Sequence, residues 1–259
     1  MILEKNARYT SFKLTRAAAG AAARADEGLI EQLCRLQTLY RGGMRQLCAQ
    51  LEFIDDQFRA ENDHDPIHHM ECRMKTVESI LEKAERHGLP LTVESIRTGV
   101  RDIAGVRVIC NYIDDVYRLA ELIMARDDLT VVRVSDYIAK PKENGYRSLH
   151  IVVQLPVRTS AGVTEDIPVE IQLRTVAMDA WASLEHEMMY KSDRKAVEID
   201  RMKLKICADE LAGVIRGGEN AVAAADLLLR CAALARDDPR LAAPEREEVA
   251  RSYIDRARE

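Results

Sequence analysis

The sequence predicts an α+β fold, in which helices precede and follow a mixed sheet of four to five strands. A helical period of three or four residues runs from Leu29 to Phe58, and four short β-type runs follow between residues 106 and 173. After Thr175 the apolar pattern becomes helical again. With 259 residues, 47% of them hydrophobic, the chain can bury a sizeable core.

Each expected element rests on a local pattern. The first helix, 29–58, has apolar side chains at every third or fourth position, although Gly42–Gly43 weaken its middle. A second helix is expected over 74–87, because Gly88 and a following proline are typical stop signals. Gly162 predicts a hairpin turn between the third and fourth strands. The strands are expected at 106–110, 129–134, 149–155 and 167–173, and further helices at 114–126, 176–191, 196–216 and 219–235.

Composition and charge limit the classes of partner and the cellular location that we expect for the protein. The net charge of −5 gives no general attraction to nucleic acid or to an anionic membrane, so any anion site must be local. No apolar run approaches the ~18–20 residues that span a bilayer. The charged N-terminus lacks the apolar core of a signal peptide, which predicts a cytoplasmic protein without membrane contact. The six cysteines are scattered without zinc-site spacing and are expected to be reduced, mostly core-filling thiols.

The expected helix at 74–87 carries a cationic stripe. At ~100° per residue, Lys75, Ser79 and Lys83 share one side, and Arg73 lies just upstream. Two ammonium groups with a hydroxyl between them suit a polyphosphate. The alternative is a solvated face whose lysines pair with glutamates of the same helix.

The segment 101–110 has charged residues in and before an apolar strand. Asp102 is a candidate Mg²⁺ ligand, since this ion is commonly held by one or two carboxylates and by substrate phosphate oxygens. Arg107 within the strand needs an acid to pair with or a flat ligand to stack on. The alternative is an ion pair among Arg101, Asp102 and Arg107.

The fourth expected strand has polar residues at alternate positions. Glu170, Gln172 and Arg174 share one of its faces, which indicates that this face is wet or lines a cleft. A carboxylate in that place would be able to act on a bound ligand. The alternative is the outer face of an edge strand.

The loop 140–150 is basic and contains a tight turn. Asn144–Gly145 would present Tyr146 for stacking on a nucleobase. The alternative is an ordinary basic hairpin turn. His64–Asp65 is interpreted as a polar loop, because no second histidine pair at a workable spacing accompanies it. The cations that would hold phosphates around Tyr146 are Lys140, Lys142, Arg147 and His150.

Five motifs in order resemble the synthetase domain of the RelA/SpoT alarmone synthetases, over about residues 27–235. They are R-x-K-x-x-x-S-I-L-E-K at 73–83, DIAGVRVIC at 102–110, GYRSLH at 145–150, VEIQLRT at 169–175 and MDAWASLEHEMMYK at 178–191. The length is similar to that of the small, stand-alone synthetases. The resemblance implies a nucleotidyltransferase-like synthetase domain at 27–195, a flexible extension at 1–26 and a C-terminal helical region at 196–259. That region is expected to serve oligomerisation and to end in a mobile tail.

The resemblance also implies an activity. The β,γ-diphosphate of ATP would move to the 3′-hydroxyl of GDP or GTP, giving ppGpp or pppGpp and AMP for stringent response signalling. Synthesis without hydrolysis is expected, because the chain has no room for the family's hydrolase domain. The resemblance implies that ATP is bound by Arg73, Lys75, Ser79, Lys83 and Arg107. It implies that GDP or GTP is bound by Lys142, Tyr146, Arg147, His150 and Gln172. The implied catalytic residues, which are also the implied Mg²⁺ ligands, are Asp102 and Glu170.

One segment departs from the family pattern. Some small synthetases are homotetramers whose central cleft binds pppGpp as an activator, and the segment IHHMEC at 67–72 corresponds to part of that cleft. Relatives have an aromatic residue and a threonine at the places of His69 and Glu71, and a glutamate would repel a polyphosphate. A homotetramer is still expected, because the apolar helices exceed what a small sheet needs, while activation by pppGpp stays open.

Other functions remain as alternatives. The first alternative is that the protein is a family relative with a different acceptor, either an adenine nucleotide or the 3′ end of tRNA. A tyrosine stacks on any base, so Tyr146 does not decide between these acceptors. A regulator without activity that binds nucleotides or RNA is a second alternative, and single-stranded RNA is kept as a candidate regulatory partner. A purely helical scaffold is the third. The choice between GDP and GTP is open.

Overall fold

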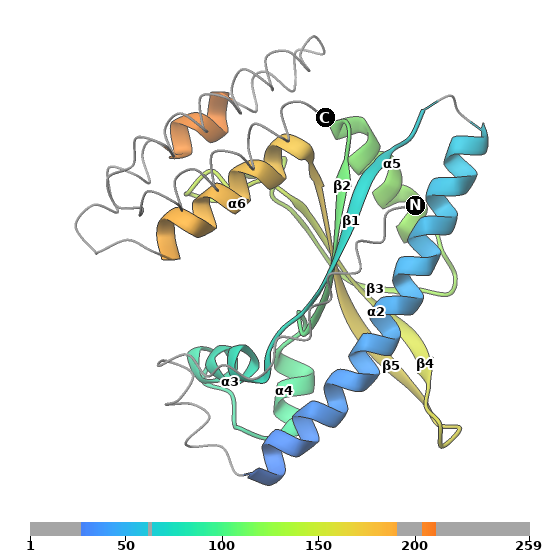
Figure 1. The fold of residues 1–259 in the computed structure, drawn as a ribbon, viewed down its shortest axis with the longest axis vertical. Helices are drawn as coiled ribbons and strands as arrows, with labels where there is room; N and C mark the ends of the chain where they lie inside the picture. The colour runs from blue at the N-terminus through green and yellow to red at the C-terminus, as the bar shows by residue number, and fades with distance from the viewer. Residues whose placement is uncertain (1–26, 62–63, 191–203, 211–259) are drawn as a thin grey trace, which may run out of the picture. The chain divides into compact units, whose positions relative to one another are not determined.

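The computed structural model describes residues 27–61, 64–190 and 204–210, and Figure 1 shows the order of its elements. Residues 204–210 are helical. The predicted α+β class, with helices around a five-stranded sheet, is confirmed. The elements are α2 (Glu27–Glu61), β1 (Ile67–Met74), α3 (Val77–Arg86), α4 (Val93–Gly99), β2 (Ala104–Cys110), α5 (Ile113–Met124), β3 (Thr130–Asp136), β4 (Leu149–Arg158), β5 (Thr164–Thr175) and α6 (Val176–Tyr190).

The chain divides into two compact units, and each is described by itself. The first unit comprises Met1–Val108, Tyr117–Ser135 and His150–Leu173, so its described part contains α2 and nearly all of the sheet. The second comprises Ile109–Val116, Asp136–Leu149 and Arg174–Glu259; its described part contains the basic loop, α6 and the helical residues 204–210.

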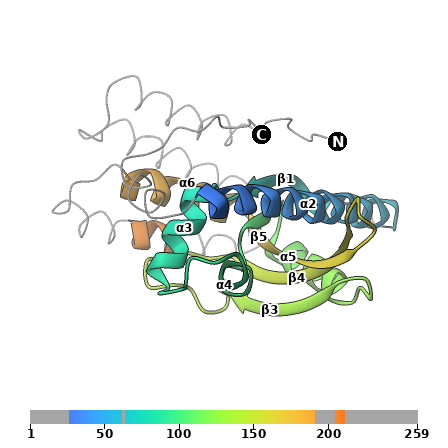
Figure 2. The same ribbon diagram turned by 90° about the horizontal axis from the view of Figure 1, so that it is seen from below.

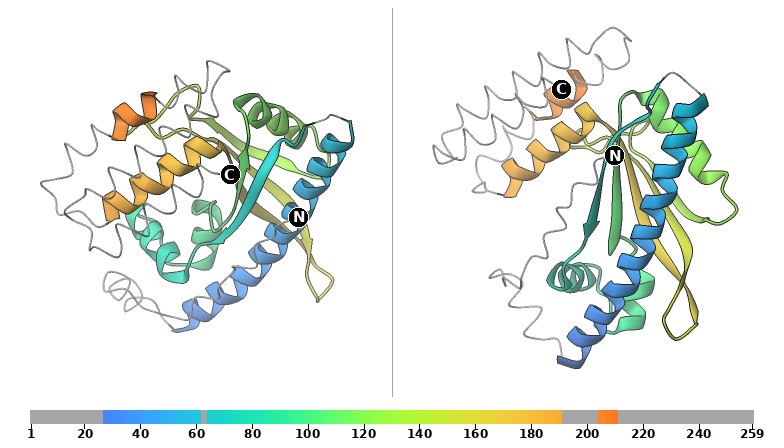
Figure 3. Two further views of the ribbon diagram at one scale, coloured as in Figure 1. Left: turned by 45° about the horizontal axis from the view of Figure 1, so that its top comes forward. Right: turned by 45° about the vertical axis from the view of Figure 1, so that its right-hand side comes forward.

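The sheet has the strand order β1-β2-β5-β4-β3. The predicted hairpin is formed by β4 and β5, whose turn is closed by a hydrogen bond from Thr159 N–H to the Val163 carbonyl (2.8 Å) and can be seen in Figure 3. Gly162 has a φ of +80° in this turn, a conformation that glycine adopts without strain. The order places β5, with its polar residues, in the interior of the sheet, which excludes the outer face of an edge strand for Glu170.

Helix α2 is one continuous helix of 35 residues that lies along one face of the sheet (Figure 2). Its fully buried residues, Leu33, Tyr40, Leu47 and Leu51, follow the predicted helical period. At Gly43, an added Cβ would lie 3.2 Å from the Ile167 side chain on β5. The glycine pair therefore does not break the helix but permits its close approach to the β4–β5 hairpin.

Two elements were not predicted from the sequence. Residues 67–74 form the edge strand β1, and residues 93–99 form the short helix α4. The expected helix at 74–87 begins later, at Val77, because the side chain of Thr76 caps it by accepting a hydrogen bond from Ser79 N–H (3.2 Å). The predicted core side of this helix is correct, since Val77, Ile80, Leu81 and Ala84 are all buried.

Some predictions fall outside the described residues. The extension 1–26, the helix at 219–235, most of the helix at 196–216 and the C-terminal tail belong to this group, and so do the domain boundaries at 26/27 and 195/196. Among the helices that the structure describes, none has the length and apolar character needed to cross a bilayer.

Candidate active site

A row of positions crosses four adjacent strands of the first unit, with polar side chains on β1, β5 and β4 and a glycine on β2. Gly105 on β2 lies between Arg73 on β1 and Glu170 on β5, since a Cβ at Gly105 would be 3.9 Å from the Arg73 carbonyl and 3.6 Å from the Glu170 carbonyl. The β4–β5 hairpin brings the side chain of His150 within 3.3 Å of the Glu170 carboxylate. By strand alternation this row lies on the face opposite to Ile167, and therefore away from α2.

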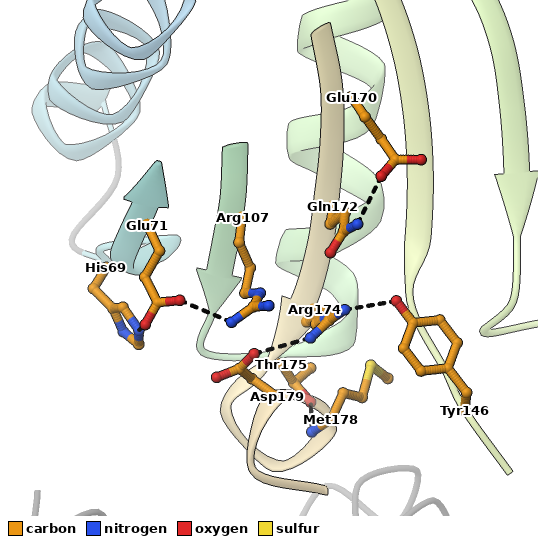
Figure 4. Close-up of polar contacts among 10 residues, drawn as sticks. All are labelled: His69, Glu71, Arg107, Tyr146, Glu170, Gln172, Arg174, Thr175, Met178 and Asp179. Carbon is orange, nitrogen blue, oxygen red and sulfur yellow. Dashed lines mark hydrogen bonds and ion pairs between the residues drawn. The ribbon is translucent and has the colours of Figure 1, made fainter. Parts of the chain in front are cut away.

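Glu170 is a buried carboxylate held by two neighbours. His150 Nδ1 lies 3.3 Å from Oε1. Gln172 Nε2 donates to Oε2 at 2.7 Å (Figure 4). Burial alone would raise the pKa of Glu170, but the hydrogen bonds and charge of these neighbours outweigh it and hold that pKa below its usual value. The charge of Asp102 acts in the opposite direction on the same pKa, so the two carboxylates are near enough to interact.

Asp102 joins both lysines of the predicted stripe. Its Oδ2 atom lies 2.6 Å from Lys83 Nζ and 3.2 Å from Lys75 Nζ. Lys75 precedes α3 and is fixed through its backbone, where Gln37 of α2 donates to its carbonyl at 2.7 Å. Burial would raise the pKa of Asp102, but the two lysines outweigh it and lower that pKa. The lysines therefore pair with this acid, in place of the helix glutamates that the alternative required.

Ser79 stands at the start of α3 beside the cap. The Ser79 hydroxyl accepts a hydrogen bond from Thr76 Oγ1 at 3.2 Å, and the Ser79 backbone N–H donates to Thr76 Oγ1. The first turn of a helix presents backbone N–H groups that favour an anion. Ser79 is thus placed on a helix end that suits a phosphate, beside the lysines at either end of the predicted stripe.

The residues around Asp102 fit a magnesium ion. Its second oxygen, Oδ1, is buried and has no hydrogen-bond partner in the structure, so it has an unused lone pair. Within the described ranges, no group of three or more His, Cys, Asp or Glu side chains forms a complete metal site. Magnesium does not need one, because it is commonly held by one or two carboxylates and the phosphates of a substrate.

Arg107 pairs with Glu71 across β1 and β2. The Nη1 and Oε2 atoms are 2.8 Å apart, and Figure 4 shows both side chains reaching toward each other from neighbouring strands. His69 Nε2 lies 4.0 Å from the other carboxylate oxygen of Glu71. The acid that pairs with Arg107 is therefore Glu71, in place of the ion pair among Arg101, Asp102 and Arg107 that was considered as the alternative. Arg73, on the same strand as Glu71, is exposed.

In the second unit, Tyr146 is fixed through its hydroxyl. Arg174 Nη2 donates to that hydroxyl at 2.6 Å (Figure 4). Lys142 Nζ lies 4.7 Å from the centre of the Tyr146 ring. The turn predicted at Asn144–Gly145 is present, since Gly145 has a φ of +92° and its N–H donates to the Lys142 carbonyl at 2.8 Å. The basic loop is therefore an ordered turn built around Tyr146.

The other three predicted acceptor residues also have contacts within the protein. Arg147 donates to the Ala208 carbonyl at 3.0 Å and pairs with Asp209 at 2.9 Å, so it holds the helical segment 204–210 against the loop. His150 and Gln172 both contact Glu170 in the first unit.

His64 and Asp65 contact Phe58 and Arg59 at the end of α2, as a polar loop would.

Sequence reasoning missed two partners in these contacts. Glu71 was interpreted only through its repulsion of a polyphosphate, and Asp179 was not considered. Asp179 accepts a hydrogen bond from Arg174 Nη1 at 3.0 Å, and both side chains are buried. The signal was present, because an arginine at the end of an apolar strand followed five residues later by an aspartate on a helix suggests a pair.

We expect Arg174→Met to destabilise the protein by ~3–5 kcal/mol, because it removes the buried guanidinium that pairs with the Asp179 carboxylate. The side chains are only 5% and 3% exposed, so solvent cannot replace the pair. Urea unfolding would measure the loss. The double variant Arg174→Met/Asp179→Leu should recover part of it, and a single variant as stable as the wild type would show that the pair is not needed.

Comparison with known proteins supplies the family. Residues 72–195 match the family described as "Region found in RelA / SpoT proteins". GTP pyrophosphokinase YjbM of Bacillus subtilis (strain 168) is 43% identical over 166 residues, which are 64% of this chain and 77% of that protein. This chain belongs to the RelA/SpoT family. A second relative, GTP pyrophosphokinase YwaC of the same organism, is 41% identical over 153 residues, or 59% of this chain and 72% of the relative.

A solved structure of a family member has the same fold. The small alarmone synthetase 1 from Bacillus subtilis, bound to its product pppGpp, superposes with a TM-score of 0.67 at 38% identity. The match covers 72% of this chain and 94% of that one. The resemblance to small RelA/SpoT synthetases inferred from the five motifs is confirmed.

Proposed function

We propose that this protein is a magnesium-dependent alarmone synthetase that transfers the β,γ-diphosphate of ATP to the 3′-hydroxyl of GDP or GTP. The observation that carries the proposal is the arrangement in the first unit, where Lys75 and Lys83 meet one oxygen of Asp102 while the other oxygen faces no partner. Glu170 lies near enough for the two carboxylates to interact. The names of the relatives and the pppGpp bound to one of them support the same reaction.

The donor nucleotide is assigned to the first unit. Lys75, Ser79 and Lys83 would contact the ATP phosphates, since the two ammonium groups now shared with one carboxylate can turn to phosphate oxygens. Arg73 and Arg107 would stack on the adenine from the edge of the sheet, because a guanidinium plane stacks on aromatic rings. Both arginines come from the strands β1 and β2, next to each other in the sheet.

Asp102 and Glu170 would hold the magnesium ion. When bound, this ion neutralises charge on the transferring phosphates and polarises the β-phosphorus. The protein contributes position and fixed charge. Asp102 has one oxygen available, and its lowered pKa keeps it ionised at neutral pH.

Glu170 would also accept the 3′-hydroxyl proton. Its lowered pKa keeps the carboxylate charged, but it also makes Glu170 a weak base. Proton transfer is therefore expected to follow the formation of the new phosphorus–oxygen bond. His150 and Gln172 position the carboxylate by their contacts with its two oxygens.

The acceptor nucleotide is assigned to the basic loop and its neighbours. Tyr146 would stack on guanine, with Lys142, Arg147 and His150 near the phosphates and Gln172 as a further contact. The hydrogen bond from Arg174 supports this role, because it fixes the orientation of the Tyr146 ring before a base arrives.

The acceptor can be tested directly. The full-length protein is incubated with γ-labelled ATP, Mg²⁺ and one of GDP, GTP, AMP or tRNA, and labelled products are separated. We expect label on GDP and GTP alone. Label on AMP or on tRNA would identify one of the alternative acceptors, and no labelled acceptor with any of the four would reject the enzyme in favour of a binding protein.

Tyr146→Ala should raise the KM for GDP by ~10-fold or more, since stacking on a base contributes ~1–3 kcal/mol. Tyr146→Phe keeps the ring and loses the hydrogen bond from Arg174 to the hydroxyl, so its KM for GDP should stay within ~3-fold of the wild type. The KM for ATP is the internal control and should not change in either variant. Equal effects of alanine and phenylalanine would contradict base stacking.

Glu71→Gln should raise the KM for ATP by ~2–5-fold while kcat stays unchanged, because a partly exposed ion pair holds Arg107 in place. Initial rates at varied ATP would measure it. Glu78→Gln, a glutamate in the first turn of α3 outside this pair, is the matched control. An unchanged or lower KM would show that Glu71 does not position Arg107.

The assembly, location and regulation are part of the proposal. We place the enzyme in the cytoplasm as a homotetramer, which light scattering of the purified chain would measure. Synthesis without hydrolysis and binding of single-stranded RNA are expectations of this proposal, whereas activation by pppGpp stays open.

A further inference from the structure

Two thiols of the first unit lie in contact on the other side of β1 from the donor residues. Cys48 on α2 and Cys72 on β1 have Sγ atoms 2.7 Å apart, although 24 positions separate them. Strand alternation turns Cys72 toward α2, while Glu71 and Arg73 on either side of it turn away. A disulfide bond is about 2.05 Å long, so the sulfur atoms need to approach by only roughly 0.7 Å to form one.

The two thiols differ in access to solvent. Cys48 is buried at 6% exposure, whereas Cys72 is exposed. The hydrogen bond from the Cys48 thiol lowers the pKa of Cys72, and the same bond, together with burial, raises the pKa of Cys48. An exposed thiol that ionises more readily is the one that reacts first with an oxidant, and the buried thiol is in place to attack it.

We propose that Cys48 and Cys72 form a peroxide-reactive site that closes to an intramolecular disulfide. The Cys72 sulfur attacks one oxygen of a peroxide, the O–O bond breaks, and Cys72 becomes a sulfenic acid while hydroxide leaves and is protonated to water. The Cys48 sulfur then attacks the Cys72 sulfur, the S–O bond breaks, and hydroxide takes the Cys48 proton as a second water. With hydrogen peroxide, two thiols thus give one disulfide and two waters, and two electrons pass to the peroxide.

Closing this bond would tie α2 to β1. The loop between the two cysteines contains the end of α2 and the chain that leads into β1. A cross-link over such a loop restricts the unfolded chain, so the oxidised protein should unfold at a higher temperature than the reduced one. The inference concerns the first unit alone and does not depend on the proposed reaction.

The sequence suits a direct test. Trypsin cleavage after Arg45, Arg59 and Arg73 separates the cysteines into peptides 46–59 and 60–73, each with a single cysteine. The reduced full-length protein is treated with hydrogen peroxide, blocked with an alkylating agent under denaturing conditions and digested without reductant. We expect the two peptides joined, at the sum of their masses less two hydrogens, and separated again by dithiothreitol.

Three variants complete the test. Cys48→Ala should leave Cys72 as a sulfenic acid that dimedone traps, and Cys72→Ser, at an exposed position, should abolish the joined peptides and leave Cys48 available for alkylation. Cys34→Ser, at an exposed cysteine on the same helix, should not change the cross-link. Recovery of both peptides separately alkylated after peroxide treatment, or equal trapping of Cys72 with and without Cys48, would overturn the proposal.

Discussion

Glu170→Gln is expected to reduce the transfer of diphosphate to GDP by ~10³-fold or more. Glutamine has nearly the same shape, but it removes the negative charge that would hold magnesium and accept the 3′-hydroxyl proton. The thermal unfolding midpoint should change little, because Glu170 has polar partners that an amide can also engage. Single-turnover rates at saturating ATP and GDP would measure the loss.

The same strand supplies the control. Glu165 on β5 pairs with Arg97 of α4 and lies outside the polar row, so Glu165→Gln should retain its activity. If Glu170→Gln kept more than about a tenth of the wild-type rate, Glu170 would contribute less than ~10-fold to the rate. This is below what general acid–base catalysis contributes. That result would transfer the proton acceptor to another residue, and His150 would be the first to test.

Asp102→Asn is expected to lower kcat by ~10³-fold, since a lost metal ligand removes several kcal/mol of charge stabilisation. The concentration of Mg²⁺ needed for half-maximal activity should rise in the same variant. Asp128→Asn is the matched control, because Asp128 pairs with Arg126 at an exposed site. An unchanged magnesium requirement would contradict the assignment of Asp102 as a ligand.

The free energy of unfolding, measured as a function of pH, tests the contact of Asp102 with the two lysines. The pKa of Asp102 is lowered from an ordinary value of 3.8, so the charge stabilises the folded state above that pH and the stabilisation disappears as the pH falls through the lowered pKa. The wild type should therefore be more stable than Asp102→Asn at neutral pH, and the difference should shrink in acid below about pH 4. A difference that grows in acid would contradict the two-lysine contact.

The helical and strand patterns predicted most of the fold because they reflect burial. The apolar period of α2 and the core side of α3 were both correct. The strand β1 was missed because it is an edge strand rich in polar residues, with half of its residues exposed, so it gives no apolar alternation. The glycines of α2 were misinterpreted for a related reason, since they make room for Val157 and Ile167, which are distant in the sequence.

The sequence predicted which residues belong to the candidate site, but it did not predict which of their side chains contact one another. Local spacing placed Lys75 and Lys83 on a stripe, yet only the tertiary structure brings Asp102 between them. Arg147 was expected at a phosphate, and the structure gives it contacts with Ala208 and Asp209. Contacts across sheet neighbours and between distant helices depend on register, which no short motif contains.

The most direct test of the proposed function is the fate of ATP in the reaction with GDP. The full-length protein is mixed with Mg²⁺, GDP and γ-labelled ATP, and AMP and the labelled guanine nucleotide are quantified together in the wild type and in Glu170→Gln. We predict one AMP for each labelled product, a label that stays with the guanine nucleotide, and neither product in the variant. Formation of ADP with labelled phosphate, or equal transfer by the variant, would contradict diphosphate transfer by this site.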